Sequence, residues 1–243
     1  MIRLLVAGDL EGERAALGPE AAHYLGRVLR LAPGAEIEAF DGRGLRRRAR
    51  LTRLSDDGGE LELGERLAEA ARRLEISLWQ GLAKGEKLDW VVQKATELVV
   101  SEILPFASAR SVVRLPIERA QGRVARWRKI AEEAARQSNR TDVPRVTPPA
   151  TLEELARRCA GGSPVVALHP GAPLPFGEAL ARSRGSGSLA LAVGPEGGFE
   201  PAELSALEGA GALLASLGAL VLRTETAGLV ACALAAFAAG DLG

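Results

Sequence analysis

The chain has few of the residues that build metal sites and disulfides. Its 243 residues include two cysteines and two histidines. Cys159 and Cys232 both lie in apolar, helix-like contexts, so we expect small buried side chains and not a disulfide or a metal pair. Because no Cys/His cluster occurs in the sequence, we expect no structural zinc and no other metal.

Aromatic residues, excess charge and long apolar runs are also scarce. Aromatics make up 4% of the chain and the formal net charge is zero. A platform that stacks several bases is therefore not expected, and the whole-chain charge gives no attraction to nucleic acid. The most apolar segment, 227–239, is too short to span a bilayer, and the N-terminus lacks the pattern of a signal peptide. We expect a cytoplasmic protein without a membrane partner.

The spacing of apolar residues changes near position 72. Residues 1–72 contain short strand patterns, tight turns and one helical segment at 19–30, which predicts a small β-barrel. Beyond that point strand and helix patterns alternate, which predicts a mostly parallel sheet covered by helices on both faces. We therefore expect two domains, 1–72 and 73–243. The apolar runs expected to form central strands include 164–168, 188–193 and 212–217.

A glycine-rich turn interrupts the second domain. The apolar run that ends at Val193 stops at Gly194-Pro195-Glu196-Gly197-Gly198, and a helical pattern follows. Glycine allows the backbone to approach a ligand closely, and open α/β sheets bind ligands at the carboxyl ends of their strands. This predicts a small-molecule pocket near residue 195. The alternative is an ordinary turn, since Gly-Pro and Gly-Gly pairs often mark nothing else. The turn matches neither the phosphate-binding P-loop nor the dinucleotide fingerprint.

Arginines gather in two stripes despite the zero net charge. Arg46, Arg48 and Arg50 alternate along one predicted strand and so project from one face. The second stripe lies on a predicted helix and its end: Arg119, Arg123, Arg126, Lys129, Arg136 and Arg140. Such stripes suit RNA phosphates, and two of them favour an RNA partner. The alternative is a solvated face with local salt bridges.

Several short motifs follow one another in a specific order. They are 23–30 (HYLGRVLR), 40–44 (FDGRG), 93–98 (QKATEL), 133–140 (EAARQSNR), 193–199 (VGPEGGF) and 216–227 (SLGALVLRTETA). In this order and spacing the chain resembles the RsmE family of 16S ribosomal RNA uridine-N3 methyltransferases over almost its whole length. The resemblance implies an α/β, SPOUT-type sheet with a trefoil knot, preceded by a PUA-like β-barrel.

The resemblance also implies an activity and its partners. The protein would use S-adenosylmethionine to methylate N3 of a uridine in the decoding region of 16S rRNA, as free rRNA or in the small ribosomal subunit. It would act as a homodimer. The residues expected to contact RNA are Arg46, Arg48, Arg50, Lys94, Arg136, Gln137 and Arg140.

Strand-end segments are expected to hold the cofactor. The residues are Leu168, His169, Gly194, Pro195, Gly197, Gly198, Leu217, Gly218, Leu222, Arg223 and Thr224. Backbone groups would contact the adenine edge while Leu217 and Leu222 flank the ring, although core packing is the alternative for both leucines. For His169 we expect only the backbone to take part.

The nucleophile sets the catalytic requirement. A sulfonium methyl group is already activated, so catalysis consists mainly of positioning. Uracil N3 carries a proton, so the site needs a base or a cation that stabilises the uracil anion. Glu196, Arg223 and Glu225 are candidates because they lie on the predicted cofactor loops. Arg136 and Arg140 are further candidates from the basic helix. The alternative for Glu225 is a carboxylate that stabilises the start of a helix.

Two other functions stay open. A ribose 2′-O methyltransferase of the same knotted class would carry an Asn-rich segment in place of residues 222–227, which this chain lacks. A non-catalytic ribosome assembly factor that binds RNA would keep both arginine stripes without needing the glycine-rich turn.

Overall fold

The computed structural model describes residues 2–68, 72–111 and 117–242, and the side chains of residues 117–119 lie outside this description. The chain divides into two compact units. The first unit holds the residues up to 71 together with Glu132–Val143, and the second holds the rest.

The first unit is built on a five-stranded sheet in the order β1-β3-β4-β5-β2. Its elements are β1 (Ile2–Leu5), β2 (Arg14–Leu17), α1 (Pro19–His23), one π-helical turn η1 (Tyr24–Val28), β3 (Glu36–Phe40), β4 (Arg46–Ser55) and β5 (Gly58–Arg66). The strands cover one core that contains Leu4, Leu25, Ile37 and Leu51. Strand β2 is not predictable from the sequence, because its RAAL segment is short and has little β-branched or aromatic character.

A tight hairpin turn joins β3 to β4. The two strands pair antiparallel, and the Asp41 N–H donates to the Leu45 carbonyl at 3.0 Å. Gly42 and Gly44 have φ angles of 74° and 106°, a region that side chains disfavour. These two glycines are what allow so tight a turn.

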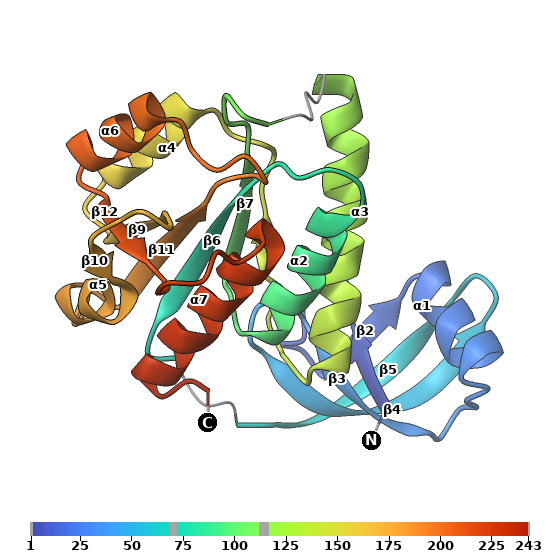
Figure 1. Ribbon diagram of the computed structural model, residues 1–243. Coiled ribbons are helices and arrows are strands. Elements are labelled where there is room, and N and C mark those ends of the chain that lie inside the picture. Colours follow the sequence, from blue (N-terminus) through green and yellow to red (C-terminus); the bar gives the residue numbers. More distant parts are fainter. Residues whose placement is uncertain (1, 69–71, 112–116, 243) are drawn as a thin grey trace. The chain divides into compact units, whose positions relative to one another are not determined.

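The second unit is built on a seven-stranded sheet in which every pairing is parallel (Figure 1). The spatial order is β10-β12-β9-β11-β6-β7-β8. The strands are β6 (Glu75–Gly81), β7 (Glu102–Phe106), β8 (Arg145–Val146), β9 (Val165–Leu168), β10 (Leu174–Pro175), β11 (Ser188–Val193) and β12 (Leu213–Ser216). The predicted central strands are confirmed. Strands β8 and β10 have two residues each, too few to leave a pattern in the sequence.

Helices lie on both faces of this sheet, as predicted. They are α2 (Lys87–Glu97), α3 (Ile117–Gln137), α4 (Leu152–Cys159), α5 (Phe176–Arg182), α6 (Pro201–Gly209) and α7 (Thr224–Ala239). Helix α7 packs on β6, β11 and α2, while α4 and α6 share a core with the opposite face (Figure 1). Residues 117–131 of α3 belong to this unit and its last turns to the first.

Both cysteines are buried and free, as expected from their apolar contexts. Complete burial raises the pKa of the Cys232 thiol to about 12, so it stays protonated and unreactive at neutral pH. Within the described residues, no helix is long and apolar enough to cross a membrane. The same part of the chain holds no group of three or more His, Cys, Asp or Glu residues that could bind a metal.

The path of the chain brings three loops to one edge of the second sheet. Strand β12 inserts between β9 and β10, after which residues 217–223 return to the start of α7. Because parallel strands end at the same edge, the loops after β9, β11 and β12 meet there. The candidate site lies where they meet.

Candidate active site

A cavity of about 550 Å³ is lined by the loops after β9, β11 and β12. This volume lies within the range of roughly 300–1,000 Å³ that is typical of small-molecule pockets. The cavity brings together every residue that the sequence analysis assigned to the cofactor: Leu168, His169, Gly194, Pro195, Gly197, Gly198, Leu217, Gly218, Leu222, Arg223 and Thr224. Glu196 and Glu225 line it as well. These residues therefore form one site.

Glycines keep the turn after β11 both tight and bare. A Cβ atom on Gly81, at the end of β6, would lie 2.4 Å from the Pro195 nitrogen, and one on Gly194 would lie 2.9 Å from the Gly198 carbonyl carbon. Neither position tolerates a side chain. Gly198 and Gly218 have φ angles of 68° and 108°, and a Cβ on either would meet open space. The turn is thus packed closely against the sheet and open elsewhere.

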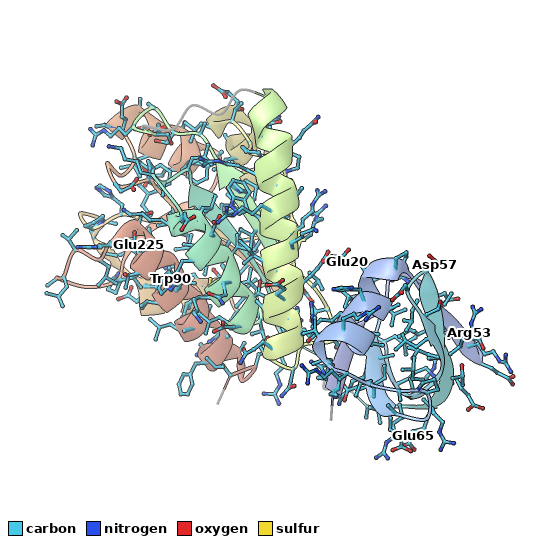
Figure 2. All side chains as sticks on the ribbon, turned by 90° about the vertical axis from the view of Figure 1, so that its right-hand side faces the viewer. Glu20, Arg53, Asp57, Glu65, Trp90 and Glu225 are labelled. Atoms are coloured by element: carbon cyan, nitrogen blue, oxygen red, sulfur yellow. The ribbon has the colours of Figure 1, made fainter. Side chains whose placement is uncertain are left out.

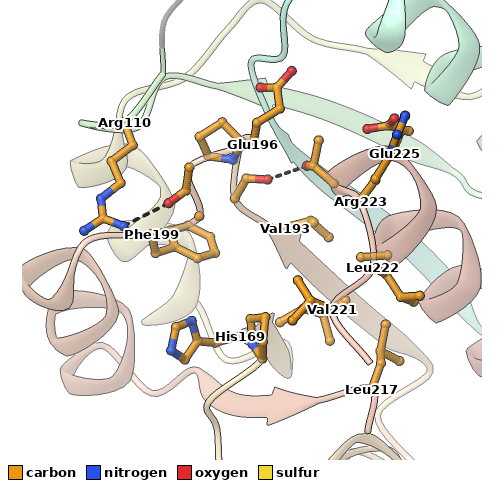
Figure 3. Close-up of a pocket in the computed structure, with 18 of the residues that line it drawn as sticks. Arg110, His169, Val193, Glu196, Phe199, Leu217, Val221, Leu222, Arg223 and Glu225 are labelled. Atoms are coloured by element: carbon orange, nitrogen blue, oxygen red, sulfur yellow. Dashed lines mark hydrogen bonds between the residues drawn. The ribbon is translucent and has the colours of Figure 1, made fainter. Parts of the chain in front are cut away.

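Two buried side chains fix this turn to the start of α7. The Thr224 hydroxyl donates to the Gly194 carbonyl (Figure 3). The same hydroxyl accepts a hydrogen bond from Gln80 Nε2 at 2.8 Å. Gln80 and Thr224 are both buried. The hydrogen-bonded chain from β6 through α7 to the turn holds two walls of the pocket at a constant separation.

The far end of the turn is held from the other side. The Phe199 ring stacks on Phe106 with 5.8 Å between ring centroids and 7° between ring planes. Arg110 Nη1 donates to the Gly197 carbonyl at 2.9 Å (Figure 3). The sequence analysis missed Arg110, although its place a few residues beyond the end of an apolar strand was a usable signal.

The surroundings of Leu217, Leu222 and His169 are consistent with the expected cofactor contacts. Leu217 and Leu222 line the cavity and are only half-buried, which favours ligand contact over core packing. At His169, the backbone N–H donates to the Ala215 carbonyl at 2.9 Å and the carbonyl accepts from Ala172 N at 3.0 Å. The backbone of His169 can therefore offer a ligand only the remaining lone pair of its carbonyl oxygen.

Lys87, which the sequence analysis missed, lies between the two candidate carboxylates. Its Nζ is 2.8 Å from Glu196 Oε1 and 3.7 Å from Glu225 Oε2. The backbone N–H of Lys84 also donates to Glu196 Oε1, at 3.1 Å. The usable signal was a Lys-Gly-Glu-Lys segment at the start of α2, directly beyond a strand that ends beside the pocket.

The ion pair between Lys87 and Glu196 shifts the pKa of both groups. The hydrogen bond to Glu196 raises the pKa of Lys87 above its usual 10.5. Partial burial disfavours ionised Glu196, but the hydrogen bonds from Lys87 and the backbone outweigh it and lower the pKa of Glu196 below its usual 4.5. A carboxyl whose pKa falls on folding contributes stability above its unfolded pKa and loses it as pH falls through the folded value. The pair is therefore intact at neutral pH. It is lost in acid when Glu196 takes up a proton, and in strong base when Lys87 gives one up.

The first arginine stripe is paired with carboxylates on its own sheet. Arg46 Nη1 is 3.6 Å from Glu38, Arg48 Nε is 2.8 Å from Glu65, and Arg50 Nη2 is 3.7 Å from Glu36. Figure 2 shows side chains of both signs over this unit, with Arg53 and Glu65 labelled. This is the arrangement of a solvated face with local salt bridges, and an RNA phosphate would have to compete with these carboxylates.

The other residues expected to contact RNA lie in different environments. Arg140 is 5% exposed in its side chain and ion-paired with Asp142 at 2.7 Å, so it is largely buried within the first unit. Arg136 lies over the Tyr24 ring at 4.9 Å, and Gln137 is exposed. Lys94 is paired with Glu97. Among the remaining arginines of that stripe, the side chain of residue 119 lies outside the described residues.

Two protein families match this chain, one in each of its two parts. The RNA methyltransferase domain family matches residues 70–236, and the RNA methyltransferase PUA domain family matches residues 17–63. Fold and pocket therefore define an RNA methyltransferase with a PUA domain. The expected fold class, a SPOUT-type parallel sheet with flanking helices preceded by a PUA-like part, is confirmed.

Individual relatives narrow this class. Ribosomal RNA small subunit methyltransferase E of Bacillus subtilis is 35% identical over 219 residues, covering 87% of this chain and 85% of the relative. The structure of its Neisseria gonorrhoeae counterpart bound to S-adenosylmethionine is 33% identical, with a TM-score of 0.88 and 98% of each chain covered. A Legionella pneumophila protein solved with the cofactor SAM is 30% identical, with a TM-score of 0.86 and 98% coverage of each chain. The chain belongs to the ribosomal RNA small subunit methyltransferase E family.

Proposed function

We propose that the protein transfers a methyl group from S-adenosylmethionine to N3 of a uridine in the decoding region of 16S rRNA, in the cytoplasm. The observation that carries this proposal is the glycine-bare cavity at the ends of β9, β11 and β12. The proposal is also supported by the similarity of this chain to proteins whose structures were solved with S-adenosylmethionine. We also take residues 217–223 as the segment that completes the trefoil knot, and position 72 as the domain boundary.

The residues present fit the proposed cofactor. Open space beside Gly198 and Gly218, where any other residue would place a Cβ, leaves room for a ligand against the backbone. Leu217 and Leu222 offer apolar surface to an adenine ring. When bound, S-adenosylmethionine supplies a methyl group that its sulfonium has already activated. The protein then has to orient the uracil ring, exclude water and manage the N3 proton.

Calorimetry and nucleoside mapping test this proposal. We expect the purified protein to bind S-adenosylmethionine, and rRNA from cells that lack the gene to lose one base-methylated uridine. Mass spectrometry of rRNA nucleosides separates a methylated base from a methylated ribose. A lost ribose methyl group would point to the 2′-O methyltransferase instead, and a failure to bind the cofactor would favour the assembly factor.

We further propose that the protein is a homodimer. Helix α7 carries Leu234 and Phe237 with exposed fractions of 46% and 67%, which is unusual for large apolar side chains on one short stretch. We expect a dimer in sedimentation at micromolar concentration, and a shift toward monomer in the double variant Leu234→Asp, Phe237→Asp. Val28→Asp, at another exposed apolar residue, is the control. A wild-type protein that sediments as a monomer would contradict the proposal.

A further inference from the structure

Three charged side chains of the pocket come from three different elements. Lys87 is the first residue of α2, Glu196 lies in the turn after β11, and Glu225 is in the first turn of α7. All three line the cavity. Figure 3 shows Glu196 and Glu225 at the same pocket, each on a different segment of the chain. Tertiary folding thus places one cation between two carboxylates beside the open space.

The two carboxylates differ in how they are bonded. Glu196 Oε1 accepts hydrogen bonds from Lys87 Nζ and from the Lys84 backbone. Glu225 Oε2 is buried and, within the described residues, has no hydrogen-bond partner, although it lies 3.7 Å from Lys87 Nζ. A buried acceptor without a donor is costly, and a ligand that brings a donor removes this cost. Glu225 is therefore the carboxylate of the pocket that can accept a proton-bearing group.

Lys87 remains a donor in this arrangement. Its hydrogen bond to Glu196 uses one of the three ammonium protons and keeps the group protonated. Glu225 lies in the first turn of α7, where the helix dipole interacts favourably with negative charge. The pocket wall thus presents an ammonium donor beside a carboxylate acceptor.

The donor of Lys87 and the acceptor of Glu225 match the hydrogen-bonding pattern of uracil and not that of cytosine. The Watson–Crick edge of uracil has a carbonyl acceptor on each side of the N3–H donor, whereas cytosine presents a bare N3 acceptor beside an amino donor. Enzymes that act on a flipped base read this edge by hydrogen bonds. We propose that Lys87 and Glu225 together recognise uracil, with Lys87 donating to a ring carbonyl and Glu225 accepting from N3–H. The proposal rests on the proposed function and names its missing substrate contacts.

Glu225 and Lys87 can also manage the N3 proton of uracil and the charge that its removal leaves. The N3–H bond breaks as the proton moves to the Glu225 carboxylate, and the electron pair stays on N3. That pair forms the bond to the transferred methyl carbon, whose former bonding pair remains on the donor sulfur. Lys87 stabilises the negative charge that passes through the ring carbonyl. Glu225 later releases the proton to water.

The test compares two target RNAs that differ at one base. Small-subunit rRNA carrying uridine or cytidine at the methylated position is incubated with full-length protein, and base methylation is followed under single-turnover conditions. We expect Glu225→Gln to slow uridine methylation by about 100-fold or more, the range for loss of a general base. Because the substitution removes the repulsion between the carboxylate and the lone pair of cytosine N3, the ratio of uridine to cytidine methylation should fall as well. Glu178→Gln, an exposed glutamate of α5, is the matched control.

The pH profile separates a catalytic role from a structural one. The wild-type rate should be nearly level between pH 7 and 9, because Glu225 and not hydroxide takes the N3 proton. The Glu225→Gln rate should rise about tenfold per pH unit, because deprotonation of N3 then depends on hydroxide. A slower variant with an unchanged base ratio and pH profile would overturn the proposal, and so would an unchanged rate.

A second variant protects the test against misfolding. If Glu225→Gln no longer binds S-adenosylmethionine in calorimetry, Lys87→Gln decides. We expect it to be slow on uridine and to recover much of its rate on 5-fluorouridine, whose N3–H is more acidic and needs less stabilisation of the anion. Equal losses on both bases would reject the role of Lys87. Wild-type protein that binds the cofactor but methylates neither RNA would instead refute the proposed function itself.

Discussion

Gly81→Ala is expected to lower the methylation efficiency, kcat/KM, by about 100-fold, although it adds a single methyl group outside the cavity lining. The new Cβ would lie 2.4 Å from the Pro195 nitrogen and 2.7 Å from the Gly194 carbonyl carbon. Both contacts are with backbone, so no side chain can rotate away. Restoring an ordinary contact of about 3.4 Å requires the turn to move by roughly 1 Å, and such displacements near reacting groups cost on the order of 100-fold.

A matched glycine substitution provides the control for Gly81→Ala. Gly177 lies exposed in α5, and a Cβ there would have no neighbour within 4 Å. Gly177→Ala should leave methylation unchanged and raise stability slightly, since alanine favours a helix over glycine. Cofactor affinity from calorimetry and single-turnover rates are measured for both variants. Wild-type affinity and rate in Gly81→Ala would show that the turn after β11 can shift without consequence for the pocket.

Gly81 also shows where prediction from the sequence ends. The turn at 194–198 was predictable because an apolar strand, two glycines and a helix start follow one another locally. Nothing in the sequence near position 81 announces that its Cα faces the backbone of residue 195, since that contact exists only after β6 and β11 have paired. Local sequence patterns predict the strands and the loops. The contacts between them depend on how the parallel strands pair, which no local pattern predicts.

The charged residues illustrate the same limit in another way. Alternation of Arg46, Arg48 and Arg50 correctly placed them on one strand, but their carboxylate partners come from neighbouring strands that the pattern did not identify. For Arg140, a turn at Asn139, whose φ is 62°, directs the chain so that the arginine is buried with Asp142. Charge stripes in a sequence show which face a residue occupies and leave open what neutralises it.

Thr224→Val is expected to lower the free energy of unfolding by about 3 kcal/mol and to weaken cofactor binding. The hydroxyl of Thr224 serves two buried partners, the Gln80 amide and the Gly194 carbonyl. Valine has nearly the same shape but can neither accept nor donate. Each buried polar group left without a partner costs about 1–3 kcal/mol, so two of them account for the expected loss. The change would leave both polar atoms of the Gln80 amide without a hydrogen-bond partner within the described residues, because its Oε1 already has none there.

The accompanying loss of affinity follows from where the bond lies. Thr224 joins the turn after β11 to the start of α7, so its removal frees two walls of the pocket to separate. Thr226→Val makes the same substitution two residues further along α7, at a half-buried position outside this hydrogen-bonded chain, and should change neither quantity appreciably. Urea unfolding and calorimetry with S-adenosylmethionine measure both effects. If Thr224→Val lost stability but kept its affinity, the hydrogen-bonded chain would support the fold alone, and pocket geometry would depend on Phe199 and Arg110 at the other end of the turn.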